Sequence, residues 1–149
     1  MDELELEFEL DARLQNDCIQ LGDFPLCRLM LMNDRQYPWF ILVPRRAGVT
    51  ETYHLSDDDQ IQLMRESSTL SEALADLFSA RKMNIGMLGN IVAQLHVHHI
   101  VRQENDPAWP GPVWGKVPPV AYTDEEREAV IAKIEPLLSG EESFKPFNA

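Results

Sequence analysis

Two histidines near the middle of the chain are spaced for shared chemistry. His96 and His98 lie two residues apart in segment 94–102, whose sequence QLHVHHIVR has strand character. Because successive side chains of a strand point to opposite faces, Gln94, His96 and His98 share one face. His99 points to the other face. A neutral imidazole nitrogen held against a phosphate is a competent nucleophile, so this face predicts chemistry at phosphorus.

Cleavage of a phosphoanhydride through a covalent intermediate makes three demands on a protein. It needs a nucleophile with a free lone pair, a partner for the nucleophile's other nitrogen, and donors that face the phosphate oxygens. A strand carbonyl can orient His96, and the glycine-containing loop at 86–90 can approach a phosphate closely. No carboxylate cluster lies beside the histidines in the sequence. We therefore expect no required cofactor, with Mg²⁺ at most accompanying the substrate.

The segments around these histidines predict a single α+β domain built on an antiparallel sheet. Apolar runs at 26–32 and 39–43 are separated by a turn-forming segment and favour a hairpin. Two further strands are expected at 83–87 and 95–101. The pattern shows no internal repeat and no alternation of strands with helices, which disfavours a parallel sheet.

Helix signals flank the predicted strands. Ser56 followed by three aspartates predicts a long helix to about residue 80, and the capping box that begins at Thr123 predicts a C-terminal helix. Apolar residues about four apart predict a shorter helix from Leu10 to Gly22. The remaining expectations are an extended arm at 3–10, an irregular proline-rich segment at 107–119, one domain over 1–140 and a loose tail over 141–149.

The composition narrows the class of protein. With 149 residues the chain fits one domain. Its 13 basic and 25 acidic residues give a formal net charge of -12, which argues against general affinity for nucleic acid or an anionic membrane. Cys18 and Cys27 imply neither a disulfide framework nor a structural zinc site. The chain shows no secretory signal and no apolar run long enough to span a membrane, so we expect a cytoplasmic protein.

Segment 94–100 resembles the defining motif of the histidine triad (HIT) family, His-φ-His-φ-His-φ-φ with φ apolar, and Gln94 stands in place of the first histidine. Further matches occur in the family's order and extend the resemblance over roughly residues 24–115. The chain resembles the bacterial diadenosine-polyphosphate-hydrolase-like branch of the family. The matches are Val43-Pro44-Arg45-Arg46 (the family's V-P-basic-basic), Asn84-Ile85-Gly86 (its Asn-x-Gly), Gly89-Asn90-Ile91-Val92 (its Gly-Gln-x-Val phosphate loop) and Trp109-Pro110-Gly111-Pro112 (a Trp-Pro loop).

The resemblance implies a fold, an assembly and a reaction. The fold is an antiparallel sheet of about five strands with a long helix and a C-terminal helix, and the assembly is a homodimer whose sheet continues between subunits. By the same resemblance, His96 attacks the α-phosphorus of a nucleotide and holds the nucleotidyl group until water removes it. His98 would donate to phosphate oxygens or protonate the leaving group. The other implied contacts are Asn33 near the ribose, and Asn84, Gly89 and Asn90 around the phosphates.

The glutamine at the first triad position leaves the reaction open. In the family this residue supports the nucleophile by hydrogen bonding, and the amide of Gln94 can still donate and accept. The expected function is hydrolysis of a dinucleoside polyphosphate or a nucleotidyl conjugate. The alternatives are a nucleotidylyltransferase, or a nucleotide-binding or scaffold protein with weak activity. A metal-binding module that uses His96, His98 and His99 is disfavoured, because His99 is expected on the opposite face.

Overall fold

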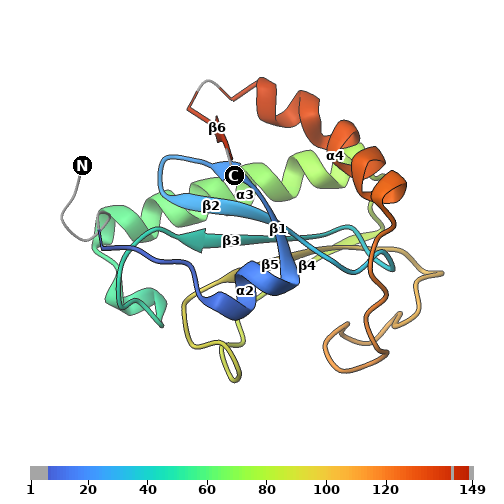
Figure 1. Cartoon of the computed structure of the whole chain (residues 1–149), viewed down its shortest axis with the longest axis horizontal. Coiled ribbons are helices and arrows are strands. Elements are labelled where there is room, and N and C mark those ends of the chain that lie inside the picture. The colour runs from blue at the N-terminus through green and yellow to red at the C-terminus, as the bar shows by residue number, and fades with distance from the viewer. Residues whose placement is uncertain (1–6, 142, 148–149) are drawn as a thin grey trace.

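The computed structural model describes residues 7–141 and 143–147. At its centre is a six-stranded sheet in the order β4-β5-β3-β2-β1-β6, in which every neighbouring pair is antiparallel (Figure 1). The strands are β1 (Cys18–Asp23), β2 (Cys27–Met32), β3 (Trp39–Pro44), β4 (Lys82–Gly86), β5 (Val97–Arg102) and β6 (Lys145–Pro146). The helices are α2 (Ala12–Asp17), the 3-10 helix η1 (Thr52–His54), α3 (Asp57–Leu77) and α4 (Asp124–Ser139).

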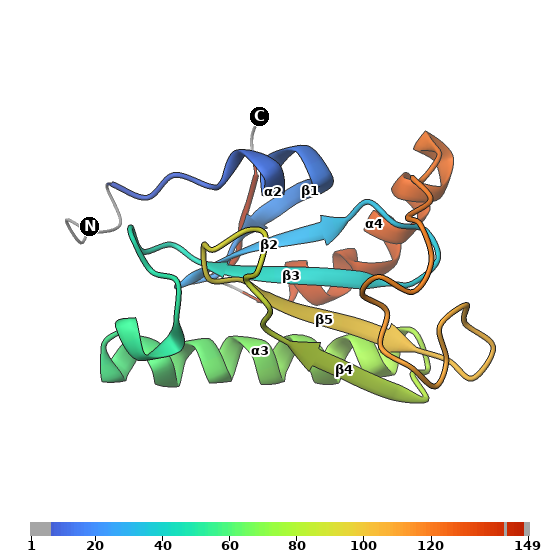
Figure 2. The ribbon, with the colours of Figure 1, turned by 90° about the horizontal axis from the view of Figure 1, so that it is seen from below.

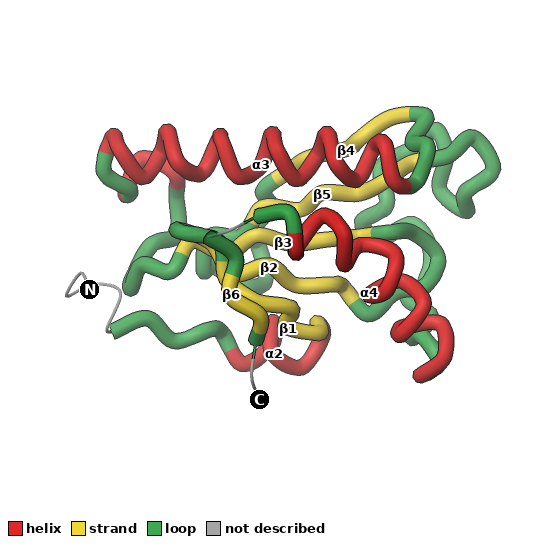
Figure 3. Tube along the Cα trace, turned by 90° about the horizontal axis from the view of Figure 1, so that it is seen from above, coloured by secondary structure: helices red, strands yellow, loops and turns green. Residues whose placement is uncertain are grey.

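The two faces of the sheet have different covers. Helices α3 and α4 lie on one side, which we call the helix face, and Figure 3 shows them in front of the strands. Helix α2 and the loops that follow β4 and β5 lie on the other side, the loop face, which Figure 2 shows from below. The loop face is the side on which strand alternation places the two catalytic candidates.

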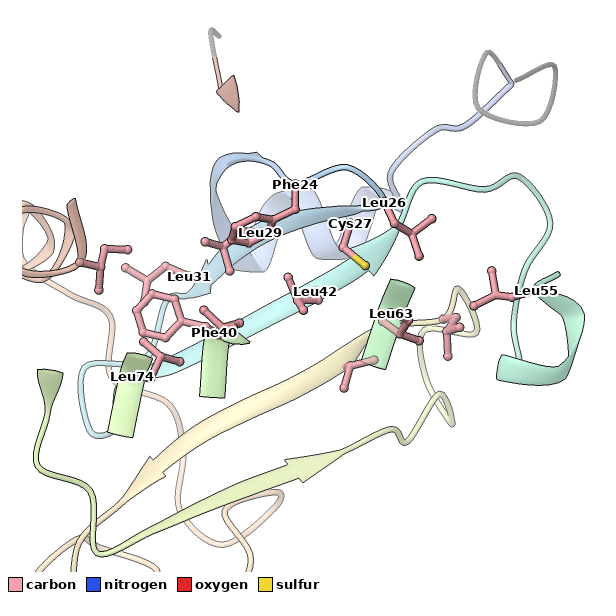
Figure 4. Close-up of a cluster of buried hydrophobic side chains, with 14 of the residues drawn as sticks. Phe24, Leu26, Cys27, Leu29, Leu31, Phe40, Leu42, Leu55, Leu63 and Leu74 are labelled. Carbon is pink, nitrogen blue, oxygen red and sulfur yellow. The ribbon is translucent and has the colours of Figure 1, made fainter. Parts of the chain in front are cut away.

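Strand β3 separates two hydrophobic clusters and is buried along its whole length. Phe40 and Leu42 belong to the larger cluster on the helix face, which Figure 4 shows. Trp39 and Ile41 alternate with them and belong to the smaller cluster on the loop face. Because β3 is apolar on both sides, its sequence is a continuous apolar run rather than an alternating one.

Helix α3 begins where the sequence predicts and is held to the sheet by a buried carboxylate. The Ser56 hydroxyl accepts a hydrogen bond from the N–H of Asp59, and three aspartates lie in the first turn. Two turns further, the carboxylate of Glu66 accepts the backbone N–H groups of Leu26 and Cys27, each at 2.9 Å. These contacts satisfy the charge of a side chain that is 7% exposed.

The predicted hairpin, long helix, histidine-bearing strand and C-terminal helix are confirmed with small shifts of their ends. The predicted helix from Leu10 to Gly22 is wrong in its second half, because α2 ends at Asp17 and residues 18–23 form β1. Cys18 pairs with Met32 of β2, so hydrogen bonding to the neighbouring strand outweighs the helical spacing of these apolar residues. Half of the predicted arm at 3–10, residues 3–6, lies outside the described residues, and residues 7–10 form no strand.

The sequence predicts a loose tail over 141–149, but the structure pairs part of it, within residues 143–147, with the sheet. Residues 145–146 form β6 and pair with Gly22 and Asp23 of β1. The ring of Phe144 lies 5.0 Å from that of Phe24, which fixes the segment against the larger cluster. Strands β1 and β6 therefore bring the sheet to six strands, and the structure is a single α+β domain with a long helix and a C-terminal helix. None of the helices in the described part of the chain is long and apolar enough to cross a membrane.

Candidate active site

His96 directly precedes β5 and has the tautomer that a nucleophile requires. Its Nδ1 lies 2.7 Å from the main-chain oxygen of Gln94. Because a carbonyl oxygen only accepts, Nδ1 carries the proton and Nε2 keeps its lone pair. The side chain is 7% exposed, but it borders a cavity of about 250 Å³. The ring is therefore oriented by the main chain and lines a cavity.

The loop that follows β4 lines the same cavity as His96. Gly89 lines the same cavity and has a φ of +76°, in the left-handed region that favours glycine. Thr50 and Thr52, on the segment before α3, also line it. Asn90 is exposed and lies outside the residues that line this cavity, so its predicted phosphate contact stays a prediction.

His98 shares the loop face with His96, and their ring centroids are 4.9 Å apart. The indole Nε1 of Trp39 lies 3.0 Å from His98 Nδ1. Trp114, from the loop after β5, approaches the same imidazole edge-on with centroids 5.3 Å apart. Burial, followed by the influence of His96 and of His99, lowers the pKa of His98 to about 3. His98 is therefore a neutral imidazole near physiological pH.

Gln94 supports the nucleophile through its main chain, while its side chain holds another segment. The amide Oε1 accepts from the N–H of Asp11 at 2.9 Å, and Nε2 donates to the oxygen of Glu9 at 2.9 Å. Asp11 in turn caps α2 by accepting from the N–H of Arg13. The glutamine at the first triad position thus joins the His96 strand to the N-terminal segment.

A larger cavity of about 670 Å³ adjoins the His96 cavity, and Leu88 lines both. Its volume is in the range of sites for small molecules of nucleoside size. Asn33 lies in its wall, where its Oδ1 accepts from the N–H of Tyr122 at 3.0 Å. The other side chains that define this cavity include Arg13 and Asn16 of α2, together with Trp39, Ile91 and Trp114.

Asn84 lies on the loop face of β4 but is bound to a buried ion pair. Its Oδ1 accepts from Arg102 Nη1 at 2.7 Å. Arg102 is 1% exposed and pairs with Asp106 through two hydrogen bonds, at 2.8 and 3.0 Å. The rings of Tyr37 and Trp109 flank its guanidinium group. The Asn84 oxygen is thus occupied in the structure, and its predicted contact with phosphate stays a prediction.

His99 lies on the helix face, as strand alternation predicts. Its Nε2 is 2.7 Å from the hydroxyl of Ser67 on α3, and the side chain is fully buried. Burial lowers its pKa to about 4. This histidine connects β5 to α3 and cannot converge with His96 and His98 on one ligand. Among the described residues, no group of three or more histidine, cysteine or acidic side chains is placed to hold a metal ion.

Trp39 is the main site residue that the sequence does not predict, and for Trp114 the sequence leaves open whether it covers the substrate or the partner subunit or packs as an anchor. Trp39 opens β3 and faces Ile100 across the sheet, a register that a single sequence does not reveal. Trp114 lies in the proline-rich loop, and a Cβ atom built at Gly86 would come within 3.0 Å of its ring. The sequence points to Trp39 only when β3 is known to pair with β5. Strand alternation then places the indole on the same face of the sheet as His98.

The fold and the site together define a class of protein. An antiparallel α+β domain presents one imidazole with a free Nε2, a second neutral imidazole beside it, and two adjoining cavities of phosphate and nucleoside size. This arrangement suits nucleophilic chemistry on a nucleotide.

Comparisons with known proteins identify the family. The model of the HIT domain matches residues 13–105. A histidine triad protein from Marinobacter aquaeolei VT8, known from a crystal structure, has 54% sequence identity to this chain and a TM-score of 0.87. The match covers 90% of this chain and 98% of that one. A histidine triad (HIT) protein from Sinorhizobium meliloti 1021 is 46% identical, with a TM-score of 0.86 and coverage of 89% and 98%. A histidine triad protein from Bradyrhizobium japonicum is 43% identical, with a TM-score of 0.84 and coverage of 87% and 96%.

A search among curated proteins found no significant match. The domain match and the three solved structures show that the chain belongs to the HIT family. Proteins of this family are generally nucleotidyl hydrolases or transferases.

Proposed function

We propose that this protein is a cytoplasmic nucleotide hydrolase that cleaves dinucleoside polyphosphates or nucleotidyl conjugates at the α-phosphate through a nucleotidyl-His96 intermediate. The observation that carries the proposal is the state of His96. Its Nδ1 is hydrogen-bonded to the Gln94 oxygen at 2.7 Å, which leaves the lone pair on Nε2, and His96 lines the 250 Å³ cavity. Family membership supports the reaction class.

In the first proposed step, His96 Nε2 attacks the α-phosphorus. A P–N bond forms, the bond from phosphorus to the bridging oxygen breaks, and the remaining polyphosphate leaves with the electron pair as an anion. The imidazole then carries positive charge, which the Gln94 carbonyl offsets by accepting from Nδ1–H. No proton has to move in this step when the leaving group is a polyphosphate.

In the second step, a water oxygen attacks the same phosphorus from the side that the leaving group vacated. The P–N bond breaks, its electron pair returns to His96 Nε2, and the proton of the water passes to solvent. The product is a nucleoside monophosphate. The chemistry uses an imidazole in place of a metal-activated hydroxide, so Mg²⁺ would enter only with the phosphates of the substrate.

The adjoining cavities suggest how the substrate is oriented. We place the α-phosphate beside His96 and the nucleoside in the 670 Å³ cavity, since Leu88 borders both spaces. Asn33 in the wall of the larger cavity would then meet the ribose. Gly89 would bring backbone close to the phosphate. Leaving groups would extend past the loop segment that carries Thr50.

The test is product analysis in ¹⁸O-labelled water with dinucleoside polyphosphates and nucleotidyl conjugates. We expect one ¹⁸O atom in the nucleoside monophosphate, no label in the leaving group, and loss of turnover in His96→Asn. His54→Asn is the matched control, because it replaces an exposed histidine that lies outside both cavities. Transfer of the nucleotidyl group to an added sugar phosphate in preference to water would make the protein a transferase. Nucleotide binding without turnover would overturn the proposal in favour of a binding protein.

We also propose that two copies pair through β4, the edge strand next to β5. The outer part of this edge exposes apolar side chains, with Ile85 at 50% and Met87 at 51%. A cavity of about 450 Å³ lies between this edge and α3, where Met64 is 66% exposed. Pairing would cover this surface and continue the sheet. Sedimentation analysis should give a dimer that Ile85→Lys converts to a monomer, and a monomeric wild-type protein would contradict the proposal.

A further inference from the structure

The hydrogen bond between Trp39 and His98 has only one possible direction. Indole nitrogen donates and has no lone pair to accept with, so the 3.0 Å contact requires an unprotonated Nδ1 on His98. A neutral imidazole without a proton on Nδ1 carries it on Nε2. Trp39 is 6% exposed and His98 5%, so water does not compete for this contact.

The groups around His98 oppose a positive charge on its ring. Its titratable neighbours along the chain are His96, just before β5, and His99, and the electrostatic influence of both disfavours protonation. Trp39 reaches it from β3, Trp114 from the loop after β5, and Gly86 lies opposite on β4. These neighbours include no carboxylate. A protonated His98 would lose its bond to Trp39 and stand as a buried cation without a counter-ion.

We propose that Trp39 is a positioning residue that holds His98 in the Nε2–H tautomer, so that His98 acts as a neutral hydrogen-bond donor to the phosphate and never as an acid for the leaving group. The inference rests on the proposed function of the same site. It decides between the two roles that the family resemblance leaves open for His98.

This assignment predicts a class of substrate. A polyphosphate leaves as a stable anion and needs no proton, whereas an amine that leaves from a phosphoramidate must acquire one as the P–N bond breaks. A neutral imidazole is too weak an acid to supply that proton at physiological pH. The site therefore favours dinucleoside polyphosphates and other substrates with acidic leaving groups over nucleotidyl amines.

The direct test is nitrogen NMR of ¹⁵N-histidine-labelled protein without substrate. We expect His98 to show a protonated Nε2 and an unprotonated Nδ1 from neutral pH to about pH 5, the range above its lowered pKa. In Trp39→Phe both tautomers should appear and protonation should begin at higher pH. Trp114→Phe is the matched control, because Trp114 also touches the His98 ring but its buried Nε1 has no hydrogen-bond partner among the described residues. This control should keep the wild-type tautomer.

The kinetic test uses a series of nucleoside 5′-phosphate aryl esters and one nucleotidyl amine. Wild-type kcat/KM should fall steeply as the leaving-group pKa rises. In Trp39→Phe the ratio of kcat/KM between substrates with acidic and basic leaving groups should shrink by on the order of tenfold, because a fraction of the protein then has a His98 that can act as an acid. A wild-type His98 that is charged or protonated on Nδ1 at neutral pH overturns the inference, as does an unchanged tautomer in Trp39→Phe. Absence of all turnover with the expected tautomer present would instead refute the proposed function.

Discussion

Removal of the Gln94 side chain is predicted to weaken nucleotide binding while leaving the nucleophile in place. His96 is oriented by the main-chain oxygen of residue 94, which an alanine keeps. The side chain instead makes two hydrogen bonds of 2.9 Å to the segment Glu9–Asp11 that leads into α2. Because α2 lines the larger cavity, loss of these bonds should loosen one wall of the proposed nucleoside site.

The size of the effect follows from the two bonds. Each side-chain hydrogen bond contributes about 0.5–1.5 kcal/mol net, and partial exposure of both places their sum at roughly 1–2 kcal/mol. If all of it is lost from binding, KM rises by about five- to thirtyfold, with kcat reduced by less than about threefold. We therefore predict a change in KM, and only a small change in kcat, for Gln94→Ala.

The assay combines steady-state kinetics with calorimetric titration of a nucleoside monophosphate and hydrogen exchange at the Asp11 amide. Gln94→Glu is a matched variant, since it can still accept from Asp11 N–H but cannot donate to the Glu9 oxygen. It should show an intermediate KM and retain part of the protection at Asp11. A collapse of kcat with unchanged KM would refute the reasoning, because it would mean that the Gln94 side chain takes part in the chemistry.

Three further predictions concern stability and the wall of the site. Because the pKa of His99 falls from 6.5 to about 4 on folding, its contribution to stability is complete above pH 6.5 and is lost as the pH falls towards 4. The free energy of unfolding, measured by urea denaturation, should therefore fall by roughly 3 kcal/mol less between pH 7 and pH 4 in His99→Gln than in wild type. An equal fall in both proteins would contradict this. Arg102→Met leaves Asp106 buried without its partner and should reduce the free energy of unfolding by about 3–5 kcal/mol in chemical denaturation, whereas a loss below about 1 kcal/mol would show that the pair is dispensable. Gly86→Ala places a Cβ atom 3.0 Å from the Trp114 ring and should shift the fluorescence of that tryptophan and raise KM. Wild-type spectra and kinetics would contradict this, because they would show that the ring can move without affecting the site.

Local sequence signals predict most of the elements that carry the site. The apolar runs of β2 and β3 and the N-cap of α3 at Ser56 are properties of a few adjacent residues, and the structure has them where they are expected. Strand β1 is different. Its residues have a helical spacing, and only pairing with β2, which a single sequence does not show, makes Cys18–Asp23 extended. Strand β6 depends in the same way on β1 and on Phe24.

The same distinction holds within the site. The placement of His96 and His98 on one face, with His99 on the other, follows from the two-residue period of a strand. The partner of the Gln94 side chain lies more than 80 residues away in the chain, and the partner of His98 Nδ1 lies 59 residues away. These contacts depend on the register of the strands and on the packing of the N-terminal segment against the site, so no local sequence pattern predicts them. They are also the contacts that decide how each imidazole is oriented.

The measurement that tests the central claim most directly is trapping of the covalent intermediate. The protein is mixed with a dinucleoside polyphosphate, quenched in base and digested, and the peptide that contains His96 is examined by mass spectrometry. A nucleoside monophosphate attached to His96, labile to acid and absent in His96→Asn, is the predicted result. Efficient turnover without any such adduct, or an adduct on His98 instead, would contradict the account of the site.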